Sequence, residues 1–332
     1  MTMTLRDSIT DVENIKVGHA QNSDAMTGCT VILCGKGAVA GISQRGGAPG
    51  TRETDLLRPM HMVQKVHAIM LAGGSAFGLD AAGGAMRFLE EKKIGFNTGK
   101  AIVPIVPSAI IYDLGIGDPK VRPDAQMGYE SCLNASSNKP EEGNYGAGTG
   151  ATVGKIFGMQ RAMKSGIGTS SKDIGGGIII GAIAVVNAFG DVVNYRTREI
   201  LAGARSSARS LKTTSQENFF ADTLEVMGTL IGRGILSFAS KQNTIIGVIA
   251  TNASLDKEGA NKFAELAADG ITLSVQPAFT MFDGDTVFSL STGKKKVDIN
   301  MLCAFAPFVF ADAIIHAVKA ASQAGDLPGS GF

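Results

Sequence analysis

The sequence has no tryptophan, only four histidines, and almost no excess of charge of either sign. Its 31 basic residues nearly balance its 30 acidic residues. A protein that binds phosphate backbones needs a basic stripe, and none is visible, so we expect no nucleic-acid partner. The four cysteines lack metal-ligand or redox spacing, and from the opening residues MTMTLRDSITD we expect no signal peptide. We therefore expect reduced, buried thiols in a cytoplasmic protein. They are Cys29, Cys34, Cys132 and Cys303.

Long uncharged runs are also scarce. The longest, IGGGIIIGAIAVVNAFG between Asp173 and Asp191, is short for a membrane-spanning helix and contains five glycines and an asparagine. A buried strand is the better interpretation, and we expect no contact with a membrane. Glycine itself is abundant, with 43 residues spread through the chain, which indicates many tight turns and close backbone approaches.

The glycine-rich stretches do not complete a nucleotide-binding motif. In the segment that begins at Gly148, Thr149 stands where a phosphate loop needs its first glycine, and Ile156 where it needs the magnesium-binding hydroxyl. The histidines form no H-E-x-x-H pattern, and no serine lies in a G-x-S-x-G turn. We therefore expect neither a cofactor nor a metal, and a hydrolase with this sequence needs a base other than histidine.

Apolar periodicity predicts alternating strands and helices without a linker, which favours one α/β or α+β layered domain over residues 1–332. Strands are expected at 29–33 and 38–42 (split by a Gly-Lys-Gly turn), 68–72, 101–106, 178–186, 244–250 and 286–291. Helices are expected at 62–66, 75–93 and 221–238, from a cap at Ser254 to a stop at Gly270, and from about Pro307, in the first turn, to 324.

Seven segments, in order along nearly the whole chain, resemble the DmpA-type family of self-processing aminopeptidases. That family includes β-aminopeptidases and, more distantly, enzymes that hydrolyse nylon oligomers. The segments are RGGAPGTRETDLL from Arg45, LAGGSAFGLDAA from Leu71, PIVPSAIIYDLGIGD from Pro104, GAGTGATVGK from Gly146, IAVVNAFGDVV from Ile183, QNTIIGVIATNASL from Gln242 and FDGDTVF from Phe282.

The resemblance implies an αββα sandwich like that of N-terminal nucleophile hydrolases, with a different strand connectivity. It also implies one self-cleavage into a large and a small chain that stay together and assemble into homo-oligomers, which we expect to be tetramers or larger. The bond cut here would be Asn243–Thr244. This would give an α chain of residues 1–243 and a β chain of residues 244–332.

Thr244 suits this chemistry. A threonine hydroxyl needs a base, and the α-amino group released by the cut has a pKa near 8, so it can act as that base on the same residue. Thr244 also opens the apolar strand TIIGVIA, which would hold the nucleophile rigidly. The resemblance assigns support before the cut to Lys155, Asn187, Asp283 and Asp285.

These four residues have individual arguments and alternatives. A buried Lys155 would have a lowered pKa and exchange protons. The Asn187 amide would donate to the oxyanion, or the residue simply ends a strand. Asp283 and Asp285 flank Gly284, so their side chains would point to the same side and hold the ammonium group of Thr244 or of a substrate. The alternatives are an Asp-Gly turn and a calcium-like loop. The neighbouring residues do not supply the further oxygen ligands that a calcium ion needs. This Asp pair is more similar to the nylon-oligomer branch.

Tyr112 matches a tyrosine that lines the family's pocket, and a core tyrosine is the alternative. The leading prediction is an aminopeptidase or amidase that acts on short peptides, amino-acid amides or β-amino acid derivatives. An endo-acting hydrolase of linear oligoamides, such as 6-aminohexanoate oligomers, is the nearest alternative. A non-catalytic oligomeric binding protein of the same fold is the third.

Overall fold

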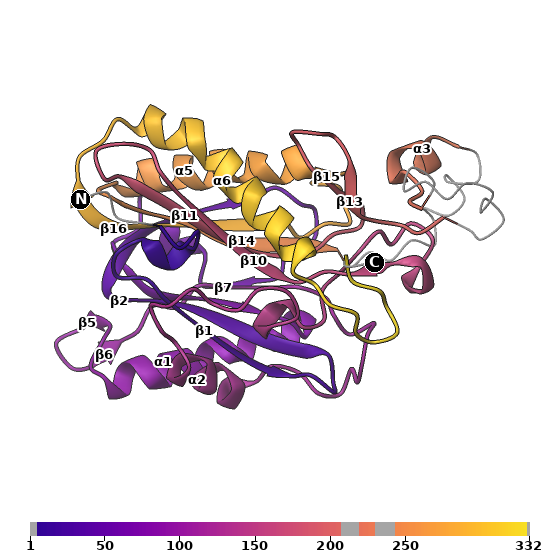
Figure 1. Cartoon of the computed structure of the whole chain (residues 1–332). Helices are drawn as coiled ribbons and strands as arrows, with labels where there is room; N and C mark the ends of the chain where they lie inside the picture. Colours follow the sequence, from indigo (N-terminus) through magenta and orange to yellow (C-terminus); the bar gives the residue numbers. More distant parts are fainter. Residues whose placement is uncertain (1–4, 207–218, 230–242, 331–332) are drawn as a thin grey trace.

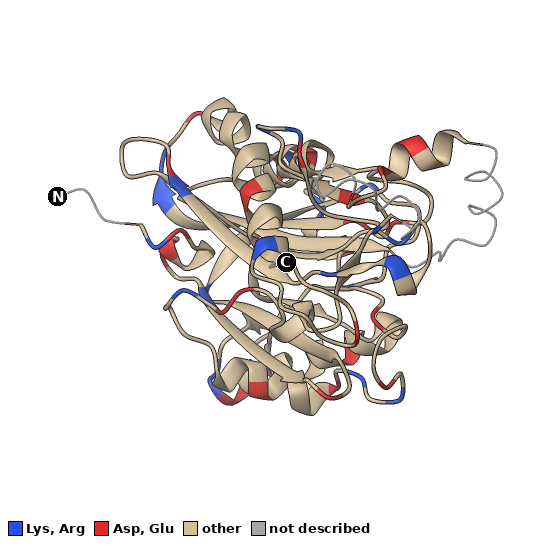
Figure 2. Cartoon of the chain, turned by 45° about the vertical axis from the view of Figure 1, so that its right-hand side comes forward, with Lys and Arg blue, Asp and Glu red and all other residues tan. Residues whose placement is uncertain are grey.

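The computed structural model describes residues 5–206, 219–229 and 243–330. They form four layers: a pair of helices, two sheets packed face to face, and a second pair of helices (Figure 1). This arrangement confirms the αββα sandwich expected from the sequence. Lys and Arg residues lie scattered among Asp and Glu residues over the fold (Figure 2).

The first sheet contains the longest apolar strands. Its order is β10 (Ile167–Asp173), β11 (Ile179–Asn187), β14 (Thr244–Ala253), β16 (Thr286–Lys295) and the second half of β2 (Thr27–Gln44). The pair β14–β16 is parallel and the other pairs are antiparallel. Successive residues of β14 alternate between two cores: Ile246 and Val248 face the other sheet, whereas Ile245 and Ile249 face the helices.

The second sheet contains β1 (Lys16–Asn22), the first half of β2, β4 (Val66–Ala72), β7 (Ser108–Ile110) and the short β3 (Thr51–Arg52). Strand β2 therefore belongs to both sheets, and its pairing is irregular between Leu33 and Ala38. Gly37, with φ 78°, lies in this irregular stretch. The prediction of two strands split by a turn was wrong, because the chain continues through the glycines from one sheet to the other.

Helices cover the outer face of each sheet. The first sheet packs against α5 (Lys257–Ser274) and α6 (Ile299–Lys319), and the second against α1 (Ala81–Glu91) and α2 (Ala125–Leu133). In the part of the chain that the structure describes, α6 alone is long and apolar enough to cross a membrane by composition. Most of its apolar side chains are instead buried against the first sheet.

The ends of α5 and α6 differ from the prediction. Asp256, not Ser254, caps α5, and the helix continues through Gly270. The glycine is needed for packing: a Cβ there would lie 2.4 Å from the backbone oxygen of Pro307 in α6. Helix α6 is capped by Asp298, so Pro307 lies inside it and not in its first turn.

Other local predictions were partly wrong. No helix covers 62–66, because the chain turns through the 3₁₀ helix η2 (Asp55–Leu57) and then enters β4. The helix expected at 75–93 begins only at Ala81, after the 3₁₀ helix η3 (Ser75–Asp80), where Phe77 is 60% exposed. The run 101–106 contains only the two-residue strand β6 (Ile102–Val103). Of the helix expected at 221–238, the structure describes α3 (Thr223–Gly228), and 230–238 lie outside the described residues.

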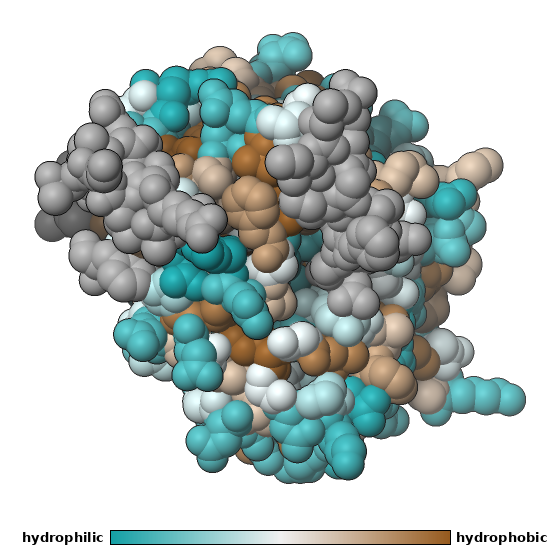
Figure 3. All heavy atoms as spheres, turned by 90° about the vertical axis from the view of Figure 1, so that its right-hand side faces the viewer, coloured by the Kyte–Doolittle hydropathy of each residue, from teal (hydrophilic) through white to brown (hydrophobic). Residues whose placement is uncertain are grey.

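The remaining elements are short. They are η1 (Ile9–Asp11), β5 (Phe96–Asn97), η4 (Gly146–Gly148), β8 (Thr152–Val153), η5 (Met159–Arg161), β9 (Met163–Lys164), β12 (Asp191–Val193), β13 (Ile200–Ala202) and β15 (Val275–Gln276). On the face that carries α3, hydrophilic and hydrophobic residues are interleaved, with hydrophobic ones gathered toward its centre (Figure 3).

Candidate active site

The residues expected to form a site meet at one end of the first sheet. Asn187 is the last residue of β11 and Thr244 the first of β14, and the two are direct partners in the antiparallel ladder. Asn243 forms a parallel bridge with Asp283, which precedes β16. Strands β11 and β14 are long and almost wholly buried, so rigid backbone holds the residues together.

The peptide bond before Thr244 has an unusual environment. The Oγ1 hydroxyl of Thr244, which is only 5% exposed, donates to the carbonyl oxygen of Asn243 at 2.6 Å. The backbone N–H of Gly284 donates to the same oxygen at 2.8 Å. A hydroxyl and an amide thus meet on one buried carbonyl, which is the arrangement that polarises a carbonyl for nucleophilic attack.

Asp283 and Asp285 hold the backbone around this bond. One carboxylate oxygen of Asp285 accepts from the N–H of Ile245 at 2.7 Å and the other from the N–H of Phe279 at 3.2 Å. Asp283 accepts from the N–H of Thr280 at 2.7 Å. Burial, with the nearby Asp283 charge adding to it, raises the pKa of Asp285 to about 7. Burial also raises the pKa of Asp283.

Lys155 and Asn187 form the other side of the site. The Nζ of Lys155 donates to the side-chain oxygen of Asn187 at 2.7 Å and to its backbone oxygen at 3.1 Å. Thr152 donates to the same side-chain oxygen through its N–H and its hydroxyl. Burial lowers the pKa of Lys155 to about 7; the Asp283 charge opposes this shift and the Lys164 charge adds to it. At neutral pH this amine therefore takes up and releases a proton readily.

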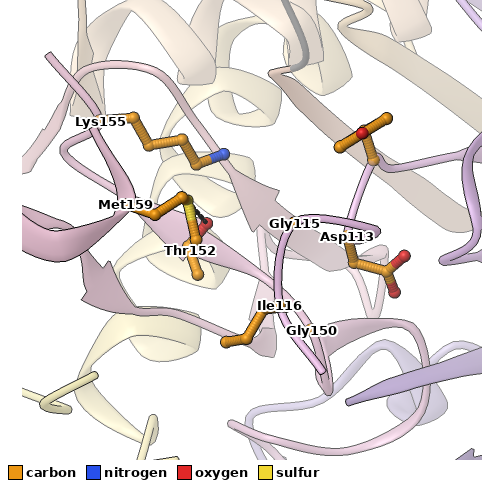
Figure 4. A pocket seen from close by; sticks show the side chains of 8 residues that line it. Asp113, Gly115, Ile116, Gly150, Thr152, Lys155 and Met159 are labelled. Carbon is orange, nitrogen blue, oxygen red and sulfur yellow. Dashed lines mark hydrogen bonds between the residues drawn. The ribbon is translucent and has the colours of Figure 1, made fainter. Parts of the chain in front are cut away.

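Tyr112 contributes a backbone carbonyl to the site. Its carbonyl accepts from the Nδ2 of Asn187 at 2.9 Å, so that amide group is oriented from both ends. Tyr112 also lines a small cavity of about 40 Å³. In Figure 4, Lys155, Thr152 and Met159 lie on one side of the cavity and Asp113 on the other, with the Asp113 carboxyl group turned away from the lysine.

Two further buried charges were not anticipated from the sequence. Asp113 accepts from the hydroxyl of Thr27 at 2.7 Å and from the N–H of Gly74 at 2.6 Å. Lys164 donates to the backbone oxygens of Thr149 and Ala151, at 2.9 and 2.8 Å. Burial lowers the pKa of Lys164 to about 7, and the Asp113 charge opposes that shift. The position of Asp113 directly after Tyr112 could have identified it in the sequence as a candidate site residue. No feature of the sequence singled out Lys164.

The arrangement can support nucleophilic attack by a hydroxyl with proton transfer. It offers the hydroxyl, a polarised carbonyl, an amine that exchanges protons near neutral pH, and two carboxyl groups in low-dielectric surroundings. Over residues 5–206, 219–229 and 243–330, no three histidine, cysteine, aspartate or glutamate side chains are grouped to hold a metal ion.

Comparison with known proteins assigns the chain a family. The model of peptidase family S58 matches residues 7–329. An uncharacterized aminopeptidase of Mycobacterium tuberculosis is 41% identical over 295 residues, which cover 86% of this chain and 82% of the relative. A 6-aminohexanoate-oligomer endohydrolase of a Kocuria species is 30% identical over 325 residues, which cover 93% of this chain and 85% of that enzyme.

Solved structures share the fold at low sequence identity. A β-aminopeptidase from a Burkholderia species superposes with a TM-score of 0.72 at 19% identity, covering 99% of this chain and 92% of that one. An L-aminopeptidase D-Ala-esterase/amidase from Ochrobactrum anthropi, described as a variant of the Ntn-hydrolase fold, gives a TM-score of 0.69 at 18% identity, covering 97% and 88%.

Proposed function

This chain belongs to peptidase family S58 and is a hydrolase of amide bonds, and on that premise we propose that it cuts itself between Asn243 and Thr244 and then uses Thr244 as its nucleophile. One observation carries the proposal: the buried Thr244 hydroxyl contacts the carbonyl oxygen of its own preceding residue, and the Gly284 N–H contacts it too. The hydroxyl, the carbonyl and a donor for the developing charge are then in place before any substrate arrives.

In the self-cleavage, the Oγ1 oxygen of Thr244 attacks the carbonyl carbon of Asn243. The C–N bond between the two residues breaks, the hydroxyl proton is transferred to the departing nitrogen, and an ester links Asn243 to Thr244. Water then hydrolyses the ester, giving a carboxylate on Asn243, a free hydroxyl, and a free α-amino group on Thr244. No outside reactant except water is needed.

Proton transfer before the cut has to come from side chains, since the α-amine does not yet exist. Lys155 is the group best suited, because burial brings its pKa to about 7 and its Nζ donates to the side-chain oxygen of Asn187, the ladder partner of Thr244. The Asp285 carboxyl group accepts from the N–H of Ile245, next to the bond, and the Asp283 carboxyl group accepts from the N–H of Thr280 in the loop before β16. After the cut, the new α-amine, with an ordinary pKa near 8, takes over as base.

For the mature protein we propose an aminopeptidase or amidase activity on short peptides, amino-acid amides or β-amino acid derivatives. The aminopeptidase names among the relatives at 41% identity support this choice. Endo-hydrolysis of linear oligoamides is the second candidate, and the relative named 6-aminohexanoate-oligomer endohydrolase supports it. A homo-oligomer of tetramer size or larger and a cytoplasmic location stay predictions.

The test is the intact mass of freshly purified protein, followed by assays on an amino-acid p-nitroanilide and a 6-aminohexanoate oligomer. We expect two chains, the smaller beginning at Thr244, and release of p-nitroaniline. Preference for the oligomer supports the endo-acting hydrolase. A persistent full-length chain that is inert toward both substrates would reject the proposal and favour a non-catalytic protein of the same fold.

A further inference from the structure

The buried carboxyl group of Asp191, the first residue of β12, connects two segments that lie further along the chain. One of its oxygens accepts from the N–H of Ala204 at 2.9 Å, and the other accepts from the N–H of Thr223 at 2.7 Å. Burial, with the charge of Asp222 adding to it, raises the pKa of Asp191 to about 6, so the carboxylate is the main form at neutral pH. This carboxylate therefore fixes residue 204 and the start of α3 relative to β12.

The first of these segments packs directly on the residue before Lys155. Gly154 has φ 71°, and a Cβ there would lie 2.0 Å from the carbonyl carbon of Gly203 and 2.1 Å from the nitrogen of Ala204. Gly203 has no more room, because its own Cβ would lie 2.3 Å from a carboxylate oxygen of Asp191. The two glycines and the carboxylate thus form one stack in which no further side chain fits.

Hydrogen bonds hold the same backbone from its other side. The N–H of Gly154 donates to the carbonyl oxygen of Gly190 at 3.0 Å, and the N–H of Lys155 donates to that of Phe189 at 2.8 Å. Both acceptors directly precede Asp191 in the chain. The backbone of Lys155 is therefore enclosed between the segment that ends at Asp191 and the segment that Asp191 holds.

This enclosure bears on the state of the Lys155 amine. The Nζ donates to both oxygens of Asn187, and burial lowers its pKa from 10.5 to about 7. The next residue, Ile156, packs with Ala204 in an apolar cluster, and Met227 of α3 packs against that cluster. If residue 204 and α3 moved away, water would reach the neighbourhood of the lysine and weaken the effect of burial.

We propose that Asp191 is a positioning residue for Lys155: by holding residues 203–204 and the start of α3 in place, it keeps the lysine amine buried. This inference rests on the proposed function, in which Lys155 exchanges the proton before the cut. It extends the site to residues 219–229, which precede the proposed cut in the chain and are joined to it through the N–H of Thr223.

The direction of the change separates positioning from a direct effect of charge. A negative charge raises the pKa of a nearby amine, so loss of the Asp191 charge alone would lower the pKa of Lys155. Loss of position admits water and raises that pKa instead. The charges that shift Lys155 are those of Asp283 and Lys164, and Asp191 is not among them.

Asp191→Asn tests the proposal, because an asparagine amide offers one acceptor to two N–H groups. Cleavage is followed by intact mass at a series of pH values. We expect the midpoint of the cleavage–pH curve to move upward by about 0.5–1 unit, a part of the shift that burial causes. An unchanged or lowered midpoint would overturn the proposal.

Asp11→Asn is the matched control for that variant. Asp11 is also buried and accepts from two backbone N–H groups, those of Arg6 and Ser8, but it holds η1 and no residue of the site. Both variants leave a buried N–H without its acceptor, so both should lose stability. Only Asp191→Asn should move the midpoint, and equal movement in the two would assign the shift to lost stability and overturn the role of Asp191.

Thr223→Pro is a milder second variant, which decides alone if Asp191→Asn gives no folded protein. Thr223 is the first residue of α3, a position that tolerates proline, and the change removes the N–H that donates to Asp191. We expect a smaller upward shift. Ala125→Pro is its control, since Ala125 begins α2 and its N–H donates to the carboxylate of Asp80. A shift of the same size in both proline variants would overturn the link between α3 and Lys155.

The wild type distinguishes this inference from the proposed function. A wild-type chain that stays uncut rejects the proposed function itself. If the wild type is cut, and the midpoint in Asp191→Asn and Thr223→Pro equals that of the wild type, only the role of Asp191 is rejected.

Discussion

Asn187 and Thr244 face each other across an antiparallel ladder, and the side-chain oxygen of Asn187 accepts a 2.7 Å hydrogen bond from buried Lys155. The amine that exchanges protons near neutral pH is therefore tied, through one residue, to the strand position of the proposed nucleophile. Substitutions of Lys155 are therefore expected to change the rate of the reaction at Thr244 while leaving the backbone of Thr244 in place.

The Thr244 hydroxyl is the first group to test. Thr244→Ala removes the attacking oxygen, so the chain should remain full length by intact mass and show no amidase activity. Thr244→Ser keeps a hydroxyl at the same place and should still be cut, at a changed rate. An alanine variant that is cut between residues 243 and 244 would contradict the mechanism.

Self-cleavage should depend on pH through Lys155. The neutral amine is the form that accepts a proton, and its pKa is lowered from 10.5 to about 7, so the cleavage rate of the wild type should rise as pH increases through about 7. Lys155→Arg keeps a permanent charge and should be slow, without this rise. The measurement is the full-length fraction over time between pH 5.5 and 8.5, a range of about 1.5 units on each side of the midpoint.

The pKa of Asp285 is also about 7, so the variant Asp285→Asn is needed to tell which of the two groups causes the pH dependence of cleavage. If Asp285→Asn still shows the rise in rate with pH and Lys155→Arg does not, the lysine is responsible. The reverse pattern would transfer the role to the carboxyl group.

Asp285→Asn should also lower stability. The carboxylate accepts from two backbone N–H groups, of Ile245 and Phe279, with different oxygens, and an asparagine amide offers only one acceptor. One buried N–H then loses its partner, at a cost of about 1–3 kcal/mol in the free energy of unfolding. Thermal or denaturant unfolding measures this. Asp55→Asn, at an exposed pair with Arg58, is the control and should change stability by less than about 0.5 kcal/mol; equal effects would contradict the argument.

Lys164 is expected to tune Lys155. Its positive charge lowers the pKa of Lys155, so Lys164→Met should raise that pKa and move the midpoint of the cleavage–pH curve upward. Loss of packing and of two hydrogen bonds alone would not move the midpoint. Lys257→Met is the matched control, because Lys257 also donates to backbone carbonyls, those of Leu56 and His61, and is not among the charges that shift Lys155. A shift common to both variants would show a general effect of destabilisation.

The sequence predicted the parts of the fold where apolar runs are long. Strands β11 and β14 were found because they are long uncharged runs, rich in Ile and Val, that are buried on both faces. Predictions were wrong where tertiary packing decides: Gly270 lies inside α5 because α6 crosses there, and Gly37 continues a strand from one sheet to the other instead of turning it. Local propensity contains no information about such crossings.

The candidate site, like the fold, could be predicted from the sequence only in part. The identity of Lys155, Asn187, Asp283 and Asp285 came from the family resemblance, and their roles stay predictions. What required the structure was the pattern of contacts: the lysine donates to Asn187, and Asp285 binds the backbone of the strand. The backbone donor at Gly284 was invisible in the sequence, because every residue except proline carries an N–H and only geometry shows which one meets the carbonyl.

The order of strands in the first sheet has a consequence for the proposed cut between Asn243 and Thr244. Strands β14 and β16, both from residues 244–332, lie between β11 and β2, both from residues 1–243. The smaller piece of the proposed cut would contribute β14 and β16 together with α5 and α6, its two strands would be hydrogen-bonded to β11 and β2 of the larger piece, and its apolar side chains would be buried in both cores. Pulling the pieces apart would open two ladders and expose apolar surface on both sides, so they should melt in one transition and separate only in denaturant.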